Sequence, residues 1–382
     1  MPGDRTVGIT GFDLARLNQA RTLLEDYVAD WVLPGAAAYI SRHGEEVAAW
    51  YLGCTDPAAE RLVTAETLFP LASVTKPMTA ALVLTLVEAG QITLDEPVCT
   101  VLAELRRSET ERITLRHLLT HTSGLPGFLV ENAALRAARQ PLAGFVAGSL
   151  RTAPRLLPGT QFCYSNVAVA LLGELASRLT GAPYADALRD RLLRPWGLGD
   201  VFLPIPEAHW PRVALVRDAA YAGTDYETFN SPYFRGLGIP WGGAYATARA
   251  VAAFTQPFLA AWSATAGDCP LSSTVRRLMT TPQMATPPAP AHPQDDMHAQ
   301  VWPEISWGLG WEVKAGRKPH FSGDLTSPAT FGHLGASGTA VWADPASGVL
   351  VVLLTNRALS SGWAASPPRQ ARFANAVMAA AT

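Results

Sequence analysis

Lysine is scarce in this chain: only three of its 30 basic residues are lysines, at positions 76, 314 and 318, and the other 27 are arginines. Arginine does not lose its proton in a protein, whereas lysine can. A lysine inside an apolar stretch of this chain therefore indicates a titratable amine rather than just a charge. The formal net charge is only −2 and no basic run occurs. This balance excludes the strongly charged surfaces that bind nucleic acid or anionic membranes.

Targeting and membrane signals are also missing. The first 20 residues lack a cationic start followed by an apolar run, so no signal peptide is visible. No stretch of about 18 or more uncharged apolar residues occurs, which excludes a membrane-spanning helix. The four cysteines, Cys54, Cys99, Cys163 and Cys269, are widely spaced without a Cys-x-x-Cys pair. We therefore expect free thiols and a cytoplasmic protein.

Several catalytic and binding motifs are absent as well. The chain contains neither a Gly-x-Ser-x-Gly motif nor a P-loop. These absences argue against an α/β-hydrolase and against a P-loop nucleotide enzyme. His117 and His121 have the i, i+4 spacing of a metal pair, but no acidic residue lies between them and no third ligand is evident. We therefore expect no metal and no other cofactor.

The most informative stretch is residues 71–90, LASVTKPMTAALVLTLVEAG. It is too apolar on all sides for a surface helix, which predicts a helix through the middle of a domain. Pro77 fits only near the start of that helix and Gly90 ends it. Ser73 then lies at or near the N-terminus, and Lys76, three residues later, lies on the same face.

Ser73 and Lys76 form a plausible nucleophile and base. A serine hydroxyl attacks well only after a base removes its proton. Burial and the positive end of the helix dipole both lower the pKa of a lysine, which lets a neutral amine act as that base. Chance alone gives roughly 0.15 Ser-x-x-Lys spacings in a chain of this composition. The spacing gains its weight from the scarcity of lysine.

The remaining pattern places strands at both ends of the chain and helices in the middle. Residues 11–32 have helical spacing, 36–53 are typical of two strands around a His43-Gly44 turn, and 99–230 are mainly helical. Strand patterns resume from 305, and a C-terminal helix begins near 367. The Pro-rich residues 281–304 indicate a long loop.

These elements predict an α/β (α+β) fold, with one antiparallel sheet built from both chain ends, flanked by helices, and an inserted all-α domain. We expect residues 1–75 and 236–382 to form the α/β domain and residues 76–235 the mainly helical domain. A catalytic cleft is expected between them.

Two further groups of residues are candidates for the site. In Tyr164-Ser165-Asn166, the phenol and the amide point the same way if the segment is extended, and a tyrosine near an ammonium group can exchange its proton. The alternative is a core tyrosine and a helix N-cap asparagine. In residues 333–336, HLGA, a glycine at 335 allows close approach to the backbone. The N–H groups of Ala336 and Ser73 could then bind an oxyanion, or the glycines could simply serve a turn.

Aromatic residues also fall in segments expected near the cleft. They suit an apolar acyl or alcohol group, although many are equally suited to the core. They are Tyr226, Phe229, Tyr233, Phe234, Trp302, Trp307 and Trp311.

Three motifs in this order resemble the serine β-lactamase and penicillin-binding-protein superfamily, most closely its class C-type enzymes and family VIII carboxylesterases. They are Ser73-Val74-Thr75-Lys76, Tyr164-Ser165-Asn166 and His333-Leu334-Gly335. HLLTHTSGL, Pro158-Gly159 and Trp241-Gly242-Gly243-Ala244 are also similar to that superfamily, and the resemblance spans roughly residues 20–360.

The resemblance implies a β-lactamase-like fold and a role for each motif. Ser73 would be the acylated nucleophile, Lys76 and Tyr164 would share the acid and base work, and Asn166 would hold the substrate. The amides of Ser73 and Ala336 would form the oxyanion hole. The superfamily usually has Lys-Thr-Gly at the third motif, where it binds carboxylates; His333 and Leu334 replace the first two residues here. A His-x-Gly motif is similar to that of the esterase members.

We therefore expect a serine carboxylesterase for short-chain or small acyl esters, working through an acyl-Ser73 intermediate, with His333 and Gly335 also at the substrate. An acyltransferase, a weak class C-type β-lactamase and a D-amino-acid peptidase are alternatives that use the same site; a non-catalytic binding protein is another. The expected partner is a small-molecule ester or amide, with no nucleic acid and no membrane, and a homo-oligomer is left open.

Overall fold

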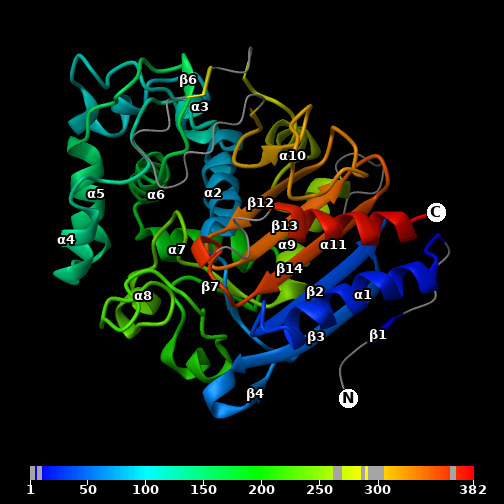
Figure 1. The fold of residues 1–382 in the computed structure, drawn as a ribbon. Helices are drawn as coiled ribbons and strands as arrows, with labels where there is room; N and C mark the ends of the chain where they lie inside the picture. The colour runs from blue at the N-terminus through cyan, green and yellow to red at the C-terminus, as the bar shows by residue number, and fades with distance from the viewer. Residues whose placement is uncertain (1–4, 7–10, 261–268, 285–288, 291–304, 362–366) are drawn as a thin grey trace.

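Strands from both ends of the chain form one antiparallel sheet, as expected. The computed structural model describes residues 5–6, 11–260, 269–284, 289–290, 305–361 and 367–382. The sheet order is β1-β3-β2-β14-β13-β12-β11-β10, with β4 paired to β3 (Figure 1). These strands are β1 (Arg5–Thr6), β2 (Gly35–Arg42), β3 (Glu45–Asp56), β4 (Arg61–Leu62), β10 (Ser306–Trp307), β11 (Glu312–Val313), β12 (Phe331–Gly335), β13 (Thr339–Asp344) and β14 (Val349–Thr355). The pairing of β2 with β14 joins the two ends of the chain.

Helices cover both faces of this sheet. Helices α1 (Leu14–Ala29) and α11 (Pro367–Ala380) pack together on one face, whereas α2 (Lys76–Glu88) and α9 (Ala248–Ala260) lie on the other (Figure 1). Packing on both faces of the sheet explains why the sequence of strand β14 is apolar throughout. Val349, Val351 and Leu353 belong to the core beneath α1 and α11, and the alternate residues belong to the core beneath α2 and α9.

The middle of the chain is mainly helical and shares a core with the inner face of the sheet. Its helices are α3 (Leu115–Leu119), α4 (Asn132–Ala137), α5 (Leu142–Arg151), α6 (Asn166–Thr180), α7 (Tyr184–Leu188) and α8 (Pro232–Leu237); α10 (Ser273–Thr280) packs beside α9. Short strands β5 (Phe69–Pro70), β7 (Val201–Phe202) and β8 (Tyr245–Ala246) form a second sheet, and β6 (Gln161–Phe162) pairs with β9 (Ala289–Pro290). One apolar cluster runs from Val352 of β14 through Leu82 of α2 to Leu171 of α6.

Local signals fix the helix that follows the Tyr164 motif. The Ser165 side chain caps α6 by accepting a hydrogen bond from the Ala168 N–H at 2.9 Å. Gly181 ends the helix with φ +68°, a left-handed conformation that glycine adopts without strain. The N-cap is therefore Ser165, whereas the sequence pattern alone also allowed Asn166 in that role.

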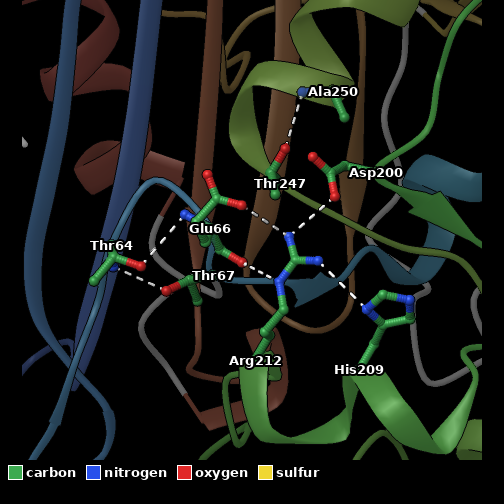
Figure 2. A network of polar contacts seen from close by, with 8 residues as sticks. All are labelled: Thr64, Glu66, Thr67, Asp200, His209, Arg212, Thr247 and Ala250. Carbon is green, nitrogen blue, oxygen red and sulfur yellow. Dashed lines mark hydrogen bonds and ion pairs between the residues drawn. The ribbon is translucent and has the colours of Figure 1, made fainter.

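A surface network holds the segment that leads to Ser73. Figure 2 shows the Arg212 guanidinium between this segment and the β7 region. It donates to the Glu66 carbonyl at 3.0 Å and lies 3.3 Å from the Glu66 carboxylate and 3.0 Å from that of Asp200. Strand β5 follows directly and pairs with β8. Arg212 and the pairing of β5 with β8 thus hold residues 64–70 in place just before the chain reaches Ser73.

Two predictions from the sequence, the free thiols and the loop at 281–304, are tested for only some of their residues. Cys54, Cys99 and Cys269 are free thiols, as expected. The predicted loop 281–304 lies mostly outside the described residues. Among the residues that the structure does describe, no helix is both long and apolar enough to cross a membrane.

Candidate active site

Ser73 lies in a short 3₁₀ turn, Ala72–Thr75, immediately before α2. Its side chain is half-buried, and its N–H is in the first turn, where backbone amides have no helical partner. The preceding Ala72 has φ +47°, an uncommon conformation for alanine. Contacts on both sides impose it, because Leu71 donates its N–H to the Ala244 carbonyl at 2.8 Å and accepts from Thr339 Oγ1 at 2.9 Å. Backbone strain of this kind is often found at functional sites.

Lys76 approaches Ser73 directly. Its Nζ lies 2.9 Å from Ser73 Oγ and donates to the Trp241 carbonyl at 2.8 Å. The residue is only 2% exposed, and burial lowers the pKa of its amine well below the usual value. A neutral amine that donates to Trp241 keeps its lone pair for the Ser73 proton. The pair can therefore act as nucleophile and base.

The segment 240–244 positions Lys76 through a series of bonds to α2. Thr79 Oγ1 donates to the Pro240 carbonyl at 2.7 Å, and Thr75 Oγ1 accepts from the Ala244 N–H at 3.1 Å. The Trp241 carbonyl lies between these two bonds and meets Lys76. Sequence patterns do not reveal this role, because it belongs to a backbone atom.

Tyr164 lies against the amine. Lys76 Nζ is 4.8 Å from the centre of the Tyr164 ring. The rings of His121, Trp307 and His333 lie around the same tyrosine, at 4.6, 5.8 and 6.1 Å between centroids. The structure therefore brings the first, second and third motifs together. It also places one predicted cleft aromatic, Trp307, at the site.

His121 is a site residue that the motif analysis considered only as a metal ligand. Its Nδ1 accepts a hydrogen bond from the Ser165 N–H at 3.1 Å, which fixes the segment after Tyr164. Burial is the main cause that lowers the pKa of His121 well below the usual value, and Lys76 lowers it further only when its own amine is protonated, so the ring is neutral. His117 Nδ1 instead accepts from the Thr114 N–H at 3.2 Å in a helix cap. The Nδ1 atoms of His117 and His121 thus each accept a backbone hydrogen bond, which is a structural role.

His333 faces the site from β12 as a neutral ring. Its Nδ1 lies 2.7 Å from the Leu334 carbonyl and therefore carries the proton, and its Nε2 is buried without a hydrogen-bond partner among the described residues. Burial, with a further contribution from Lys76 when that amine is protonated, lowers its pKa to about 4. At neutral pH neither His333 nor Leu334 offers a positive charge to a carboxylate.

Gly335 allows β12 to end against the backbone that precedes Ser73. A Cβ at this position would lie 2.1 Å from Thr339 Oγ1 and 2.2 Å from the Leu71 carbonyl oxygen. Ala336 follows and is tied to the chain beyond β14 by the bond from the Leu359 N–H to its carbonyl, at 2.9 Å. The glycine therefore sets how close the third motif comes to the nucleophile.

We expect Gly335→Ala to lower the free energy of unfolding by about 3 kcal/mol, because the added methyl forces β12 away from Leu71. Ester hydrolysis should fall as well, since Ala336 moves with the strand. Gly236→Ala is the matched control: no heavy atom outside its neighbours lies within 4 Å of the new methyl. Denaturant titration should leave that variant unchanged or slightly more stable. Equal effects of the two substitutions would contradict the close-approach argument.

Asn166 is the first residue of α6 and is 7% exposed. It lines a small cavity whose walls are otherwise mostly apolar. Trp241, whose carbonyl accepts the hydrogen bond from Lys76, lines the same cavity. The lining residues are Phe128, Leu129, Asn132, Phe145, Ser149, Asn166, Val167, Ala170 and Trp241.

The other predicted cleft aromatics divide into several groups. Phe229, Phe234 and Trp311 are buried in the main core. The Tyr233 hydroxyl donates to the Gln140 carbonyl at 2.7 Å, and Tyr226 packs on Tyr221. Trp302 lies outside the described residues.

The geometry agrees with the matches to known proteins. The model of the family described as Beta-lactamase matches residues 20–375. The chain belongs to the Beta-lactamase family. Among curated relatives, penicillin-binding protein 4 of Amycolatopsis lactamdurans is 31% identical over 87% of this chain and 83% of its own length. Esterase EstB of Burkholderia gladioli is 34% identical over 54% of this chain, a match that takes in only 52% of the esterase.

Solved structures confirm the β-lactamase-like fold. A family VIII carboxylesterase superposes with a TM-score of 0.74 at 22% identity, covering 98% of this chain and all of that one. The expected membership in the serine β-lactamase and penicillin-binding-protein group is therefore confirmed. Membership places the chain in a serine hydrolase family that has esterase relatives.

Proposed function

We propose that the protein is a serine carboxylesterase that hydrolyses short-chain or small acyl esters through an acyl-Ser73 intermediate. The observation that carries the proposal is the buried Lys76 amine, 2.9 Å from Ser73 Oγ and held by the Trp241 carbonyl. A lowered pKa on a lysine beside a serine is what general-base activation requires. The similarity to esterase EstB supports the choice of an ester as substrate.

Acylation begins with transfer of the Ser73 proton to Lys76 Nζ. Ser73 Oγ then attacks the ester carbonyl, and the tetrahedral intermediate collapses as the alkoxide leaves with a proton from Lys76 or Tyr164. Water attacks the acyl-Ser73 ester in turn, which releases the carboxylic acid and restores the serine. Lys76 Nζ lies 4.8 Å from the centre of the Tyr164 ring, so both side chains are close enough to share the acid and base work of these steps.

The oxyanion would be bound by two backbone N–H groups, those of Ser73 and Ala336. Ser73 supplies an amide from the first turn of a helix, where the dipole favours negative charge. Ala336 follows the last residue of β12, which packs against Leu71. Asn166, His333 and Gly335 would contact the substrate around this point.

The neutral third motif supports an ester over a β-lactam or a peptide. Those substrates carry a carboxylate next to the reacting carbonyl group, and His333 with Leu334 offers it no charge. The similarity to penicillin-binding protein 4 favours one alternative, namely acylation by a penicillin. Acyl transfer to an alcohol or amine and D-amino-acid peptidase activity use the same acyl-enzyme.

Intact-protein mass spectrometry tests the proposal. The enzyme is exposed briefly to a panel of p-nitrophenyl esters around the butyrate and, separately, to a penicillin. We expect rapid ester turnover and at most slow acylation by the penicillin. A long-lived penicilloyl adduct on Ser73 without ester turnover would assign a penicillin-binding protein instead. Added alcohols or amines in the same assay reveal acyl transfer by the mass of the product.

The pH profile of kcat/KM tests which group is the base. Only neutral Lys76 accepts a proton, so activity should be full above its pKa and fall as the pH drops through it. Because burial lowers that pKa, we expect this acidic limb well below pH 10.5. His333→Gln should retain the limb, since the pKa of His333 is about 4. A limb near the pKa of an exposed lysine would contradict the role of a buried neutral amine.

A further inference from the structure

The segment that carries Tyr164 is bound to one short stretch, residues 121–127, HTSGLPG. Cys163, just before the tyrosine, donates its N–H to the His121 carbonyl at 2.8 Å. Ser165, just after it, donates its N–H to His121 Nδ1 at 3.1 Å. Both neighbours of Tyr164 are therefore bound to the same residue, one to its backbone and the other to its ring.

Two more hydrogen bonds extend this contact along the Tyr164-Ser165-Asn166 motif. Ser165 Oγ donates to the Pro126 carbonyl at 2.7 Å, and the Asn166 N–H donates to the Gly127 carbonyl at 2.9 Å. Pro126 and Gly127 offer backbone carbonyls, which other residues could offer as well. His121 differs because its side chain is itself an acceptor, so the identity of this residue matters.

The backbone of His121 is shaped for this double contact. Its φ is +56°, a left-handed conformation that is uncommon outside glycine but enriched in histidine and asparagine. Helix α3 has already ended at Leu119, and the chain turns so that the carbonyl and the ring of His121 both meet residues 163–165. The residue is only 2% exposed, and burial lowers its pKa. The neutral ring keeps a lone pair on Nδ1 for the Ser165 N–H.

His121 also packs against the tyrosine whose neighbours it binds. The two rings lie 4.6 Å apart between centroids, and the Lys76 amine lies 4.8 Å from the centre of the Tyr164 ring. Lys76 Nζ is in turn 2.9 Å from Ser73 Oγ. A shift of residues 163–165 would therefore move the phenol relative to the base and the nucleophile, and small displacements of a catalytic group cost much of its effect.

We propose that His121 is a positioning residue that holds Tyr164 as the general acid for the departing alcohol. This inference rests on the proposed esterase function. As the tetrahedral intermediate collapses, the bond from the carbonyl carbon to the ester oxygen breaks, and its electron pair stays on that oxygen. The Tyr164 hydroxyl gives its proton to this oxygen, and the phenolate takes from Lys76 the proton that came from Ser73. Both side chains are then neutral again.

The leaving group decides how much this proton matters. Ethoxide is too basic to leave readily without a proton, whereas p-nitrophenolate leaves as a stable anion. A misplaced general acid therefore slows ethyl esters and largely spares p-nitrophenyl esters. General loosening of the fold would slow both. The ratio of kcat/KM for ethyl butyrate to kcat/KM for p-nitrophenyl butyrate thus separates positioning of Tyr164 from a merely structural role.

His121→Gly keeps the left-handed conformation and removes the ring acceptor. We expect kcat/KM to fall by about tenfold or more for ethyl butyrate and by no more than about threefold for p-nitrophenyl butyrate. His121→Asn should bring ethyl butyrate back to within about threefold of the wild type, because asparagine tolerates the conformation and offers an oxygen near the Nδ1 position. His121→Gln, whose oxygen lies one bond further out, should not.

Tyr164→Phe tests whether His121 acts through the phenol. That variant should show the same selective loss, and adding His121→Gly to it should lower ethyl ester turnover by no more than about twofold further. His117→Ala is the matched control. It removes a bond of the same kind, from the Thr114 N–H to His117 Nδ1 at 3.2 Å, in the cap of α3. The ratio of ethyl to p-nitrophenyl turnover should not change in that variant.

Equal loss of both esters in His121→Gly, or fully additive losses with Tyr164→Phe, would overturn the inference. If His121→Gly does not fold, His121→Asn and His121→Gln decide, and only the glutamine variant should lose ethyl ester turnover selectively. A wild type that hydrolyses no ester refutes the esterase proposal instead. The rate of penicilloyl-adduct formation then tests His121, because the β-lactam nitrogen also leaves with a proton: it should fall in His121→Gly and recover in His121→Asn.

Discussion

Ser73→Ala should lower kcat/KM for ester hydrolysis by about 10⁴-fold or more, as the loss of a nucleophile does in other serine hydrolases. Among the residues that the structure describes, the Ser73 hydroxyl is hydrogen-bonded only to Lys76, and Lys76 keeps its bond to the Trp241 carbonyl in the variant. The free energy of unfolding should therefore change by no more than about 1 kcal/mol. Turnover of p-nitrophenyl butyrate and a thermal melt check both expectations.

A fluorophosphonate probe provides the control for this result. The wild type should gain one covalent adduct and Ser73→Ala none. Ser177→Ala removes a hydroxyl from α6 that donates only to the Gly173 carbonyl, at 3.0 Å, and should keep both labelling and turnover. Hydrolysis at the wild-type rate by Ser73→Ala would remove the basis of the acyl-enzyme mechanism.

Lys76→Arg should lower kcat/KM by about 10³-fold or more, because an arginine keeps a positive charge but cannot accept the proton of Ser73. Lys76→Met should lose as much activity for the same reason. It should also be as stable as the wild type or more so, since methionine fills a similar volume and removes the burial of an amine. Steady-state kinetics and chemical denaturation measure the two effects.

The second buried lysine separates burial from catalysis. Lys314 is 4% exposed, but its Nζ donates to the Gly323 carbonyl and to the carbonyl and hydroxyl of Thr326. Lys314→Met should therefore destabilise the fold and leave kcat of the folded enzyme unchanged. A loss of kcat in that variant equal to the loss in Lys76→Met would show that burying an amine, rather than its place beside Ser73, explains the effect.

The comparison of the two lysines also shows where reasoning from composition stops. Scarcity of lysine and an apolar neighbourhood indicated a titratable amine at Lys76, which the structure supports with a lowered pKa. The same scarcity applies to Lys314, whose role in the structure is to hold the turn at 323–326. Composition identifies residues that are unusual; only their contacts distinguish a base from a structural donor.

The histidines show a second limit. His117 and His121 have the i, i+4 spacing that places two side chains on one side of a regular helix, although the lack of a third ligand already argued against a metal site. In the structure α3 ends at Leu119, and His121 follows it with φ +56°. That left-handed residue turns the ring away from His117 and toward Ser165 and Tyr164. A spacing rule fails where the helix it assumes has already ended.

The sequence by itself determined the class of fold, the sheet built from both ends and the order of three motifs, because alternation, helical spacing and turn residues are local properties. Only the tertiary structure decided which backbone atoms serve the site. The Trp241 carbonyl meets Lys76 from 165 residues away, and Gly335 meets Leu71 across the sheet edge. Burial, which lowers the pKa of Lys76, results from packing between distant segments, and no local pattern records it.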